Sequence, residues 1–328
     1  MDIIKDRFPL QKYGASYELP QWLDNYLFEE LGAVYMPDHN RFSYNLDLNI
    51  DENKIYLGTY FPRSCIECYT IFSSMFTESN YALQLQKDSL TLFDFGCGSG
   101  GDMLGILLAI EQFLPTISKV SIVAVDGNKS ALVNLDKLFA KYKENSRLDV
   151  ELEIFPFAID GEKEIKKLLE YCSIIGIDKF DFFLTSKAIC EFVSKNLVEQ
   201  NAYTYFATLF APLLSQQGIM TFVDVTIPIE SIGNRFLPYY MFEGLNDFEK
   251  QNSTQYKTIL PISCHNNATI CNKTCFSQHK IYVSHKGKTN DLTKITYRMI
   301  ARLPIAKDLQ FEGVPKDIFH GTKCNINK

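Results

Sequence analysis

Between residues 90 and 226 the sequence alternates short apolar runs with longer amphipathic ones, and this order limits the possible folds more than any other feature. The expected strands are 90–95, 119–126, 148–160, 179–187 and 218–226. The expected helices are 102–114, 129–144, 162–172 and 196–214, where apolar residues recur every three or four positions. Strands separated by helices of this length form parallel βαβ units. The sequence therefore predicts an α/β fold with a doubly wound, mostly parallel sheet.

A glycine-rich loop, "FDFGCGSGGD" (93–102), joins the first expected strand to the first helix. Gly96, Gly98 and Gly100 permit positive φ and let a ligand approach the backbone closely. In doubly wound sheets, ligands bind beyond the carboxyl ends of the strands, beside this first loop. The loop is therefore the first candidate for a binding site.

Acidic residues in and near the loop distinguish between two classes of cofactor. Gly101 completes the G-x-G-x-x-G pattern of nicotinamide-binding Rossmann domains. However, Asp94 and Asp102 would both be unfavourable beside a pyrophosphate, which prefers a positive helix N-terminus. A second strand-end acid, Asp126, is suited to accept hydrogen bonds from ribose hydroxyls. These positions favour a nucleoside cofactor without a pyrophosphate.

With these acids in place, residues 90–226 resemble the class I S-adenosylmethionine (SAM)-dependent methyltransferases, whose first motif is hhD-h-G-x-G-x-G. The resemblance implies a Rossmann-like, seven-stranded sheet. It implies that the glycine loop holds the methionine part, Asp94 its amino group and Asp126 the ribose, with Asp160 near the adenine. The expected cofactor-binding residues are Asp94, Gly96, Cys97, Gly98, Gly100, Asp126, Asn128, Asp160 and Ser186.

No catalytic residue can be assigned from the sequence. The segment after the fourth strand, "DFFLTSKAICEFV" (181–193), lacks the D/N-P-P-Y/F motif of exocyclic-amine methyltransferases. Cys190 is in an apolar context without a preceding proline, which favours a buried small residue over a nucleophile. Ser186, Lys187 and Glu191 are polar and close to the expected pocket, but none has a context that gives it a role.

Metal-ligand residue types are concentrated in "ISCHNNATICNKTCFSQHK" (262–280). Its polar neighbours do not favour burial of three cysteines as hydrophobic residues, and a metal would stabilise such a loop. Zinc would take four ligands, for example the three cysteines with His265, His279 or Cys324. A four-iron, four-sulfur cluster would favour Cys324 as the fourth. By contrast, Cys65 and Cys68 are one helical turn apart among apolar residues, which favours core packing.

This element resembles the cysteine-rich element of the Rsm-type mitochondrial small-ribosomal-subunit methyltransferase-like family and its bacterial relatives. The segment 56–72 resembles the proline-containing helix that precedes the glycine loop in that family, and the resemblance spans about residues 56–305. It implies a cysteine-bound metal or iron–sulfur site and association with ribosomal RNA or the small ribosomal subunit. The expected metal ligands are Cys264, Cys271, Cys275 and Cys324.

Charge and composition bear on the partners and the compartment. Residues 264–328 contain eleven Lys/Arg and four Asp/Glu, a net charge of +7, so residues 1–263 carry −13 of the total of −6. A basic end on an acidic body is consistent with binding to nucleic-acid phosphates. The sequence shows no signal-peptide pattern and no apolar run long enough to span a bilayer, so we expect a cytoplasmic protein with reduced cysteines and no membrane partner.

The expected organisation is an N-terminal helical region (1–88) and a methyltransferase domain (89–328). That domain would contain an inserted segment (227–262) and the cysteine element (263–280) before a last antiparallel strand pair, 279–287 and 294–304, joined across "KTND". The first functional hypothesis is a SAM-dependent RNA methyltransferase with a metal centre. The alternatives are a non-catalytic SAM-binding ribosome assembly factor and a small-molecule methyltransferase with a structural zinc.

Overall fold

The computed structural model describes residues 12–13, 16–37, 46–174, 179–259, 276–309 and 311–319. The described residues divide into two compact units. The first unit comprises those within 1–73, 96–158 and 280–293, and the second comprises those within 74–95, 159–279 and 294–328. Within the described ranges, no helix is both long and apolar enough to cross a membrane.

The first unit is built mainly from helices and the β4–β5 pair. Its elements are β1 (Lys12–Tyr13), β2 (Ser16–Glu18), α1 (Gln21–Asn25), the π-helix η1 (Tyr26–Glu30), most of α2 (Ile50–Glu78), α4 (Gly101–Phe113), β4 (Lys119–Asp126), α5 (Lys129–Asn145) and β5 (Asp149–Pro156). It also contains the turn between β11 (Phe276–His285) and β12 (Lys288–Arg302). Strands β4 and β5 pair in parallel from Lys119↔Asp149 to Asp126↔Pro156.

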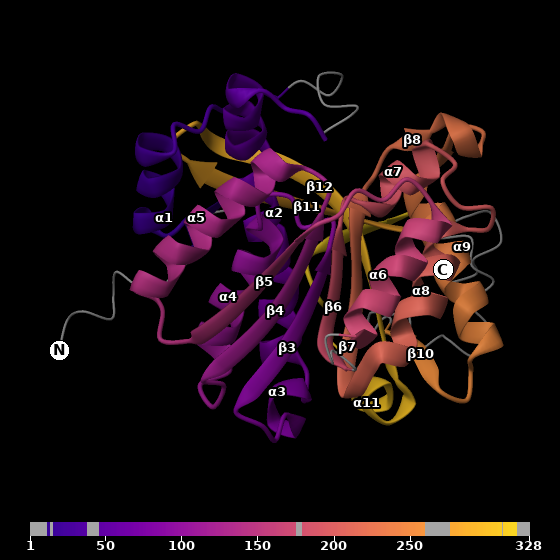
Figure 1. Ribbon diagram of the computed structural model, residues 1–328. Helices are drawn as coiled ribbons and strands as arrows, with labels where there is room; N and C mark the ends of the chain where they lie inside the picture. Colours follow the sequence, from indigo (N-terminus) through magenta and orange to yellow (C-terminus); the bar gives the residue numbers. More distant parts are fainter. Residues whose placement is uncertain are drawn as a thin grey trace. The chain divides into compact units, whose positions relative to one another are not determined.

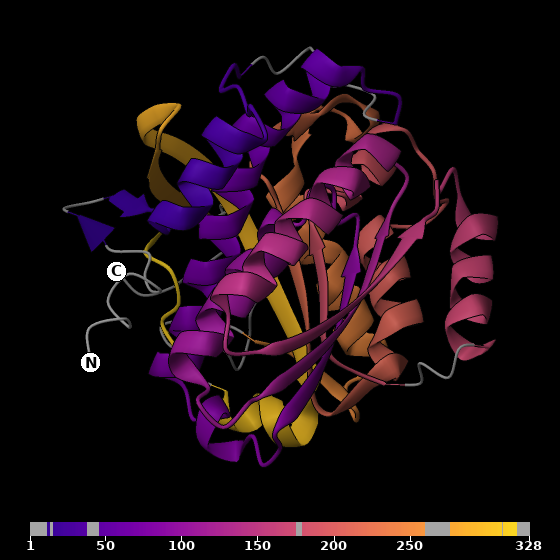
Figure 2. The same cartoon turned by 60° about the vertical axis from the view of Figure 1, so that its left-hand side comes forward.

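Two helices of the first unit follow directly from the sequence pattern. In α5, buried residues recur every three or four positions, as at Leu135, Leu138 and Tyr142, and the helix packs on β5 (Figure 2). Helix α4 is buried along nearly its whole length, which fits its near-continuous apolar sequence. The segment 56–72, for which the resemblance implies a helix, lies within α2, where Cys65 and Cys68 are both 0% exposed. Core packing is therefore confirmed for this pair.

The second unit holds most of the parallel strands. Its elements are the end of α2, α3 (Tyr81–Gln84), β3 (Ser89–Phe95), α6 (Glu162–Ile174), β6 (Phe180–Ser186), α7 (Ile189–Ser194), α8 (Ala202–Phe210), the 3-10 helix η2 (Ala211–Leu213), β7 (Leu214–Val225), β8 (Pro228–Ile229), the 3-10 helix η3 (Glu230–Ile232), β9 (Arg235–Phe236), α9 (Leu237–Gln251), β10 (Tyr256–Ile259), α11 (Leu303–Asp308) and β13 (Lys316–Phe319), with parts of β11 and β12. Strands β3, β6 and β7 are parallel neighbours, and β12 pairs antiparallel with β7. Helices α8 and α9 pack side by side, and α9 also contacts β7 (Figure 1).

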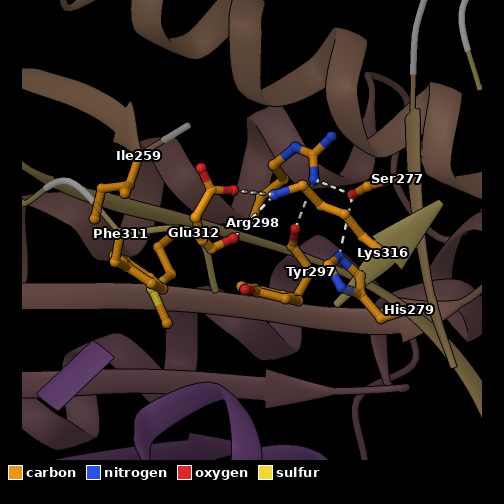
Figure 3. Close-up of a pocket in the computed structure, with 9 residues that line it drawn as sticks. Ile259, Ser277, His279, Tyr297, Arg298, Phe311, Glu312 and Lys316 are labelled. Carbon is orange, nitrogen blue, oxygen red and sulfur yellow. Dashed lines mark hydrogen bonds and ion pairs between the residues drawn. The ribbon is translucent and has the colours of Figure 1, made fainter. Parts of the chain in front are cut away.

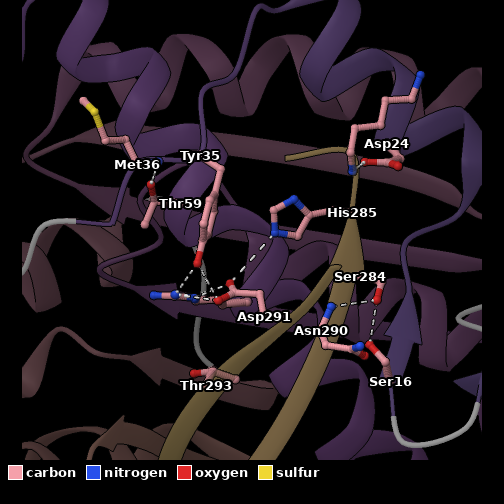
Figure 4. Close-up of polar contacts among 12 residues, drawn as sticks. Ser16, Asp24, Tyr35, Met36, Thr59, Ser284, His285, Asn290, Asp291 and Thr293 are labelled. Atoms are coloured by element: carbon pink, nitrogen blue, oxygen red, sulfur yellow. Dashed lines mark hydrogen bonds and ion pairs between the residues drawn. The ribbon is translucent and has the colours of Figure 1, made fainter. Parts of the chain in front are cut away.

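A buried ion pair joins distant parts of the first unit (Figure 4). Arg63 of α2 binds Asp291 of β12 with both ends of its guanidinium, at 2.6 Å (Nε–Oδ2) and 2.7 Å (Nη2–Oδ1). Tyr35 donates its hydroxyl to Asp291 Oδ1 at 2.8 Å. The ring of His285 stacks on Phe28, with the centroids 5.1 Å apart, and its Nε2 lies 3.9 Å from Asp291 Oδ2. Burial alone would raise the pKa of the Asp291 carboxyl, but the neighbouring His285 ring and the hydrogen bonds from Arg63 and Tyr35 hold it well below its ordinary value.

The predicted fold class is confirmed: the chain is α/β, with a largely parallel central sheet. The number of strands differs from the seven expected, because eleven described strands belong to the main sheet. The helix expected at 196–214 is wrong in extent, since α8 covers only Ala202–Phe210 and η2 follows it. The expected turn "KTND" is also wrong: the chain turns at 286–287, and residues 288–291 already belong to β12.

Candidate cofactor site

The glycine loop of the first unit has the backbone that its sequence predicts. Gly96, Gly98 and Gly100 have φ values of 77°, 51° and 78°, in the region that favours glycine. The amides of Gly96 and Cys97 both donate to the carbonyl of Val125, at 2.8 and 3.2 Å. The loop is thus fixed to the end of β4 before α4 begins at Gly101.

Asp126 holds the loop and the start of α5 together. Its Oδ2 accepts a hydrogen bond from the amide of Gly98 at 2.8 Å, and its Oδ1 accepts one from the amide of Asn128 at 2.7 Å. A carboxylate is also the kind of group that accepts hydrogen bonds from ribose hydroxyls. The sequence predicts the ribose role for Asp126, whereas its hydrogen bond to the loop depends on the path of the backbone and was not predicted.

Two buried polar atoms beside this carboxylate have no hydrogen-bond partner among the described residues. Asn128 is 2% exposed; its Oδ1 caps α5 by accepting from the amide of Ala131 at 3.0 Å, but its Nδ2 is unsatisfied. Ser99, within the loop, is 5% exposed and its Oγ is also unsatisfied. A buried polar group without a partner costs about 1–3 kcal/mol. One donor amide and one hydroxyl therefore remain for a ligand at the loop.

Helix α2 packs closely on the loop and on α4, and this contact was not predicted from the sequence. A Cβ atom added to Gly98 would lie 2.6 Å from the hydroxyl oxygen of Tyr56. A Cβ at Gly101 would lie 2.6 Å from the carbonyl oxygen of Phe61, and one at Gly105 2.1 Å from that of Cys65. The backbone of α2 therefore requires glycine at positions 101 and 105, and the Tyr56 hydroxyl lies close to Gly98 at the candidate site.

The remaining predicted cofactor residues belong to the second unit. Asp94 lies in β3 and is 0% exposed. Ser186 is the last residue of β6; it is 8% exposed, and its Oγ has no hydrogen-bond partner among the described residues. Asp160 follows β5 and is exposed. Of the predicted set, the structure therefore brings together Gly96, Cys97, Gly98, Gly100, Asp126 and Asn128 in the first unit, and the cofactor-binding roles of all nine residues stay predictions.

A buried carboxylate that the sequence analysis missed fixes the turn after β6. Lys187 has a φ of 59°, unusual for a residue other than glycine. Asp224, at the end of β7, accepts hydrogen bonds from the Tyr203 hydroxyl at 2.8 Å and from the Cys190 amide at 3.0 Å. Burial raises the pKa of Asp224 to about 6. Burial also raises the pKa of the Cys190 thiol, whose Sγ donates to the Lys187 carbonyl at 3.1 Å, which favours a packing role for Cys190.

The predicted metal ligands Cys264, Cys271, Cys275 and Cys324 lie outside the described residues. Within the described ranges, no group of three or more His, Cys, Asp or Glu side chains could hold a metal ion. His279 is described, and it is buried in β11 with Nδ1 3.0 Å from the carbonyl oxygen of Val314. The metal site therefore stays a prediction.

The comparisons with known proteins come from solved structures. No family model matches the sequence, and no curated protein matches it. The chain is similar to the plantazolicin methyltransferase BpumL in complex with SAH, with 14% identity and a TM-score of 0.41, over 85% of this chain and 93% of that one. It is also similar to a SAM-dependent methyltransferase from Leishmania major, with 10% identity and a TM-score of 0.38, over 86% and 83% of the two chains. A third is a TehB-like SAM-dependent methyltransferase from Corynebacterium glutamicum, with 8% identity and a TM-score of 0.33, over 68% and 88%. Because these TM-scores are below 0.5, the functional assignment rests on the geometry of the loop.

Proposed function

We propose that this protein is a SAM-dependent methyltransferase whose cofactor binds at the glycine loop. The observation that carries the proposal is the combination of three glycines at positive φ with Asp126 bound to the loop and with the unsatisfied Ser99 Oγ and Asn128 Nδ2. A nucleoside linked to an amino acid offers hydroxyls, ring nitrogens and a carboxylate. These groups match the chemistry of the protein groups at the loop, namely the Asp126 carboxylate as an acceptor, the Asn128 amide as a donor and the Ser99 hydroxyl. The fit needs no pyrophosphate.

The bound cofactor would supply a methyl group on a sulfonium, which is already a strong electrophile. The protein then needs mainly to hold the acceptor in line and to keep water out. In the first unit, Asp126 and Asn128 would hold the ribose side, while the loop amides and Ser99 Oγ would hold the methionine side. The hydroxyl of Tyr56 lies close enough to Gly98 to form one wall of this cofactor site.

A matched pair of glycine substitutions tests the cofactor site. Gly98→Ala and Gly233→Ala both place a side chain at positive φ, 51° and 72°. Only at Gly98 would the new Cβ meet another group, Tyr56 Oη at 2.6 Å, because nothing lies within 4 Å of the corresponding atom at Gly233. We expect calorimetry with SAH to show binding by the wild type and by Gly233→Ala, and a loss of about tenfold or more in Gly98→Ala.

Two results would contradict this assignment. One is a wild-type protein that binds NAD but not SAH, which would return the loop to the nicotinamide class. The other is Gly98→Ala binding SAH as tightly as Gly233→Ala does, which would place the cofactor elsewhere. Circular dichroism of both variants separates a local effect on the loop from a loss of folding.

For the methyl acceptor we propose RNA, with ribosomal small-subunit RNA as the first to test. The support is the net charge of +7 over residues 264–328. Phosphate contacts make binding strongly dependent on salt, so the logarithm of the affinity for RNA should fall linearly with the logarithm of the salt concentration. RNA binding without methyl transfer would instead favour an assembly factor. Absence of RNA binding even at low salt would favour a small-molecule acceptor.

A further inference from the structure

A pocket in the second unit contains an unusual group of charged side chains (Figure 3). Its empty space is about 350 Å³, which includes the open solvent at its mouth. It lies between β10, β11, β12 and the segment that follows α11. The polar residues that line it are Ser277, His279, Tyr297, Arg298, Glu312 and Lys316. None of them belongs to the proposed cofactor site.

The pocket lining is positively charged. Arg298 and Lys316 are the cations in the lining and Glu312 is the acid, which gives a net charge of +1. Arg298 is 8% exposed and the side chain of Lys316 is 9% exposed, whereas that of Glu312 is 60% exposed. The Lys316 ammonium lies 3.7 Å from Glu312 Oε2 and donates to the Glu312 carbonyl oxygen at 2.9 Å. Two largely buried cations thus share a pocket with one solvent-exposed carboxylate.

A chain of hydrogen bonds fixes the position of the guanidinium. Arg298 Nη1 donates to Ser277 Oγ and to the Tyr297 carbonyl oxygen, each at 2.8 Å. Ser277 Oγ lies 3.3 Å from His279 Nε2, and His279 Nδ1 lies 3.0 Å from the carbonyl oxygen of Val314. Because a carbonyl can only accept, we assign the proton to Nδ1, so that Ser277 donates to Nε2. The guanidinium also lies 4.8 Å from the ring centre of Phe242.

His279 adds no charge to the pocket near neutral pH. Burial, together with the positive charges of Arg298 and Lys316, lowers the pKa of its imidazole to about 3. Its role is therefore to orient Ser277 and, through it, Arg298. The positive potential comes from one planar fork of donors and one ammonium. Arginine recognises oxyanions through two parallel N–H bonds, and lysine acts beside it as a point charge.

We propose that this pocket binds a phosphate group, with Arg298 and Lys316 as its ligands. The proposal goes beyond the methyltransferase assignment and does not depend on it. A phosphate group could come from free phosphate or from the backbone of a nucleic acid, and both present the same oxyanion to the two cations. Glu312 competes with the phosphate for Lys316, so its removal should strengthen binding.

Opposite effects of two substitutions test the site in the full-length protein. With inorganic phosphate as the calorimetric probe, we expect Lys316→Gln to weaken binding about tenfold or more, since a hydrogen bond to a charged group is lost. Glu312→Gln should tighten binding by roughly two- to fivefold, because the carboxylate is mostly exposed. Lys119→Gln is the matched control: Lys119 also pairs with an exposed carboxylate, that of Glu151, but does not line the pocket. It should bind phosphate as the wild type does.

The two sources of phosphate give different results. Saturable binding of inorganic phosphate with the opposite effects at positions 316 and 312 would identify a free-phosphate site. If inorganic phosphate does not bind at millimolar concentration, but a short RNA oligonucleotide binds with the same opposite effects, the phosphate belongs to a nucleic acid. The proposal is overturned if neither probe binds, or if Lys316→Gln and Glu312→Gln change binding no more than Lys119→Gln does.

Discussion

The buried carboxylate of Asp224 should make the stability of this protein depend on pH in a specific window. Asp224 is 1% exposed, and burial raises its pKa from 3.8 to about 6, although the hydroxyl of Tyr203 and the amides of Val225 and Cys190 favour the charged form. Between these two pKa values the folded protein holds a proton that the unfolded chain has released. The contribution of Asp224 to the free energy of unfolding therefore falls as the pH rises from about 4 to about 6.

The size of this effect follows from the shift itself. A difference of roughly two pKa units at about 1.4 kcal/mol per unit gives a loss of about 3 kcal/mol, complete above pH 7. Asp224→Asn cannot ionise, so it should lack this loss. The amide will destabilise the fold by a pH-independent amount, because its NH₂ group cannot accept the hydrogen bonds that the carboxylate accepts. The prediction concerns the difference between wild type and variant as a function of pH.

Urea unfolding at half-unit steps from pH 4 to pH 7.5 measures this difference. We expect the difference in free energy of unfolding between wild type and Asp224→Asn to change by about 3 kcal/mol between pH 4 and pH 7. The profile of the control variant Asp51→Asn, at an 87% exposed side chain, should run parallel to that of the wild type. Tyr203→Phe should extend the Asp224-dependent fall to higher pH, because it removes the 2.8 Å hydrogen bond to the charged form and so raises the pKa of Asp224 further. Parallel profiles for wild type and Asp224→Asn would refute the assignment of a raised pKa to this carboxyl.

Three further outcomes can be checked in the same way. Because burial lowers the pKa of His279 to about 3, the neutral ring is favoured in the fold, and the contribution of His279 to stability should be lost as the pH drops below about 6.5, opposite in sign to that of Asp224. The difference in urea unfolding between wild type and His279→Gln should show this loss. Asp291→Asn should cost about 3–5 kcal/mol in thermal or urea unfolding, since it leaves Arg63 buried without its carboxylate, whereas a cost below 1 kcal/mol would show that the ion pair is dispensable. For the predicted cysteine site, protein purified without oxygen should contain about four irons per chain, and the Cys271→Ser variant should lack them. Stoichiometric zinc would indicate a zinc site in place of the cluster, and absence of both metals would contradict the predicted site.

The parallel core was predictable because its signals are local. Strand β4 begins and ends where its apolar run does, and α5 begins at Lys129, after a cap residue whose oxygen accepts a helix amide. The positive φ at Gly98 follows from the glycine spacing alone. Each of these features depends on residues a few positions apart, which the sequence displays directly.

Errors arose where apolar character did not identify the element. The run at 196–214 is apolar enough for one helix, but Asn201 caps its N-terminus by accepting from the amides of Tyr203 and Thr204, and α8 starts only at Ala202. The hairpin turn was assigned to polar residues 288–291, yet the two-residue turn at 286–287 contains Gly287, a stronger hairpin signal.

The sites formed by distant residues could not be predicted from one sequence. Arg298 and Lys316 are separated by a helix and a loop, and nothing in the spacing of 277, 298 and 316 indicates a shared pocket. The same is true of Tyr56, whose hydroxyl reaches Gly98 from a helix about forty residues earlier. Such contacts depend on how elements pack, and packing is not encoded in any short motif.

Ser99 and Asn128 show how packing adds to the motif at the glycine loop. The glycine motif alone is also compatible with an ordinary turn, since glycine is favoured both in tight turns and where a ligand approaches the backbone closely. The turn also buries a hydroxyl and an amide without hydrogen-bond partners among the described residues, at a cost of about 1–3 kcal/mol each unless a ligand or a water molecule pairs with them. Both atoms flank residues bound to Asp126, so a single ligand at this carboxylate could satisfy them together. Binding energy would then offset a cost that the protein alone carries, which is why these two atoms support a cofactor site more strongly than the glycines do.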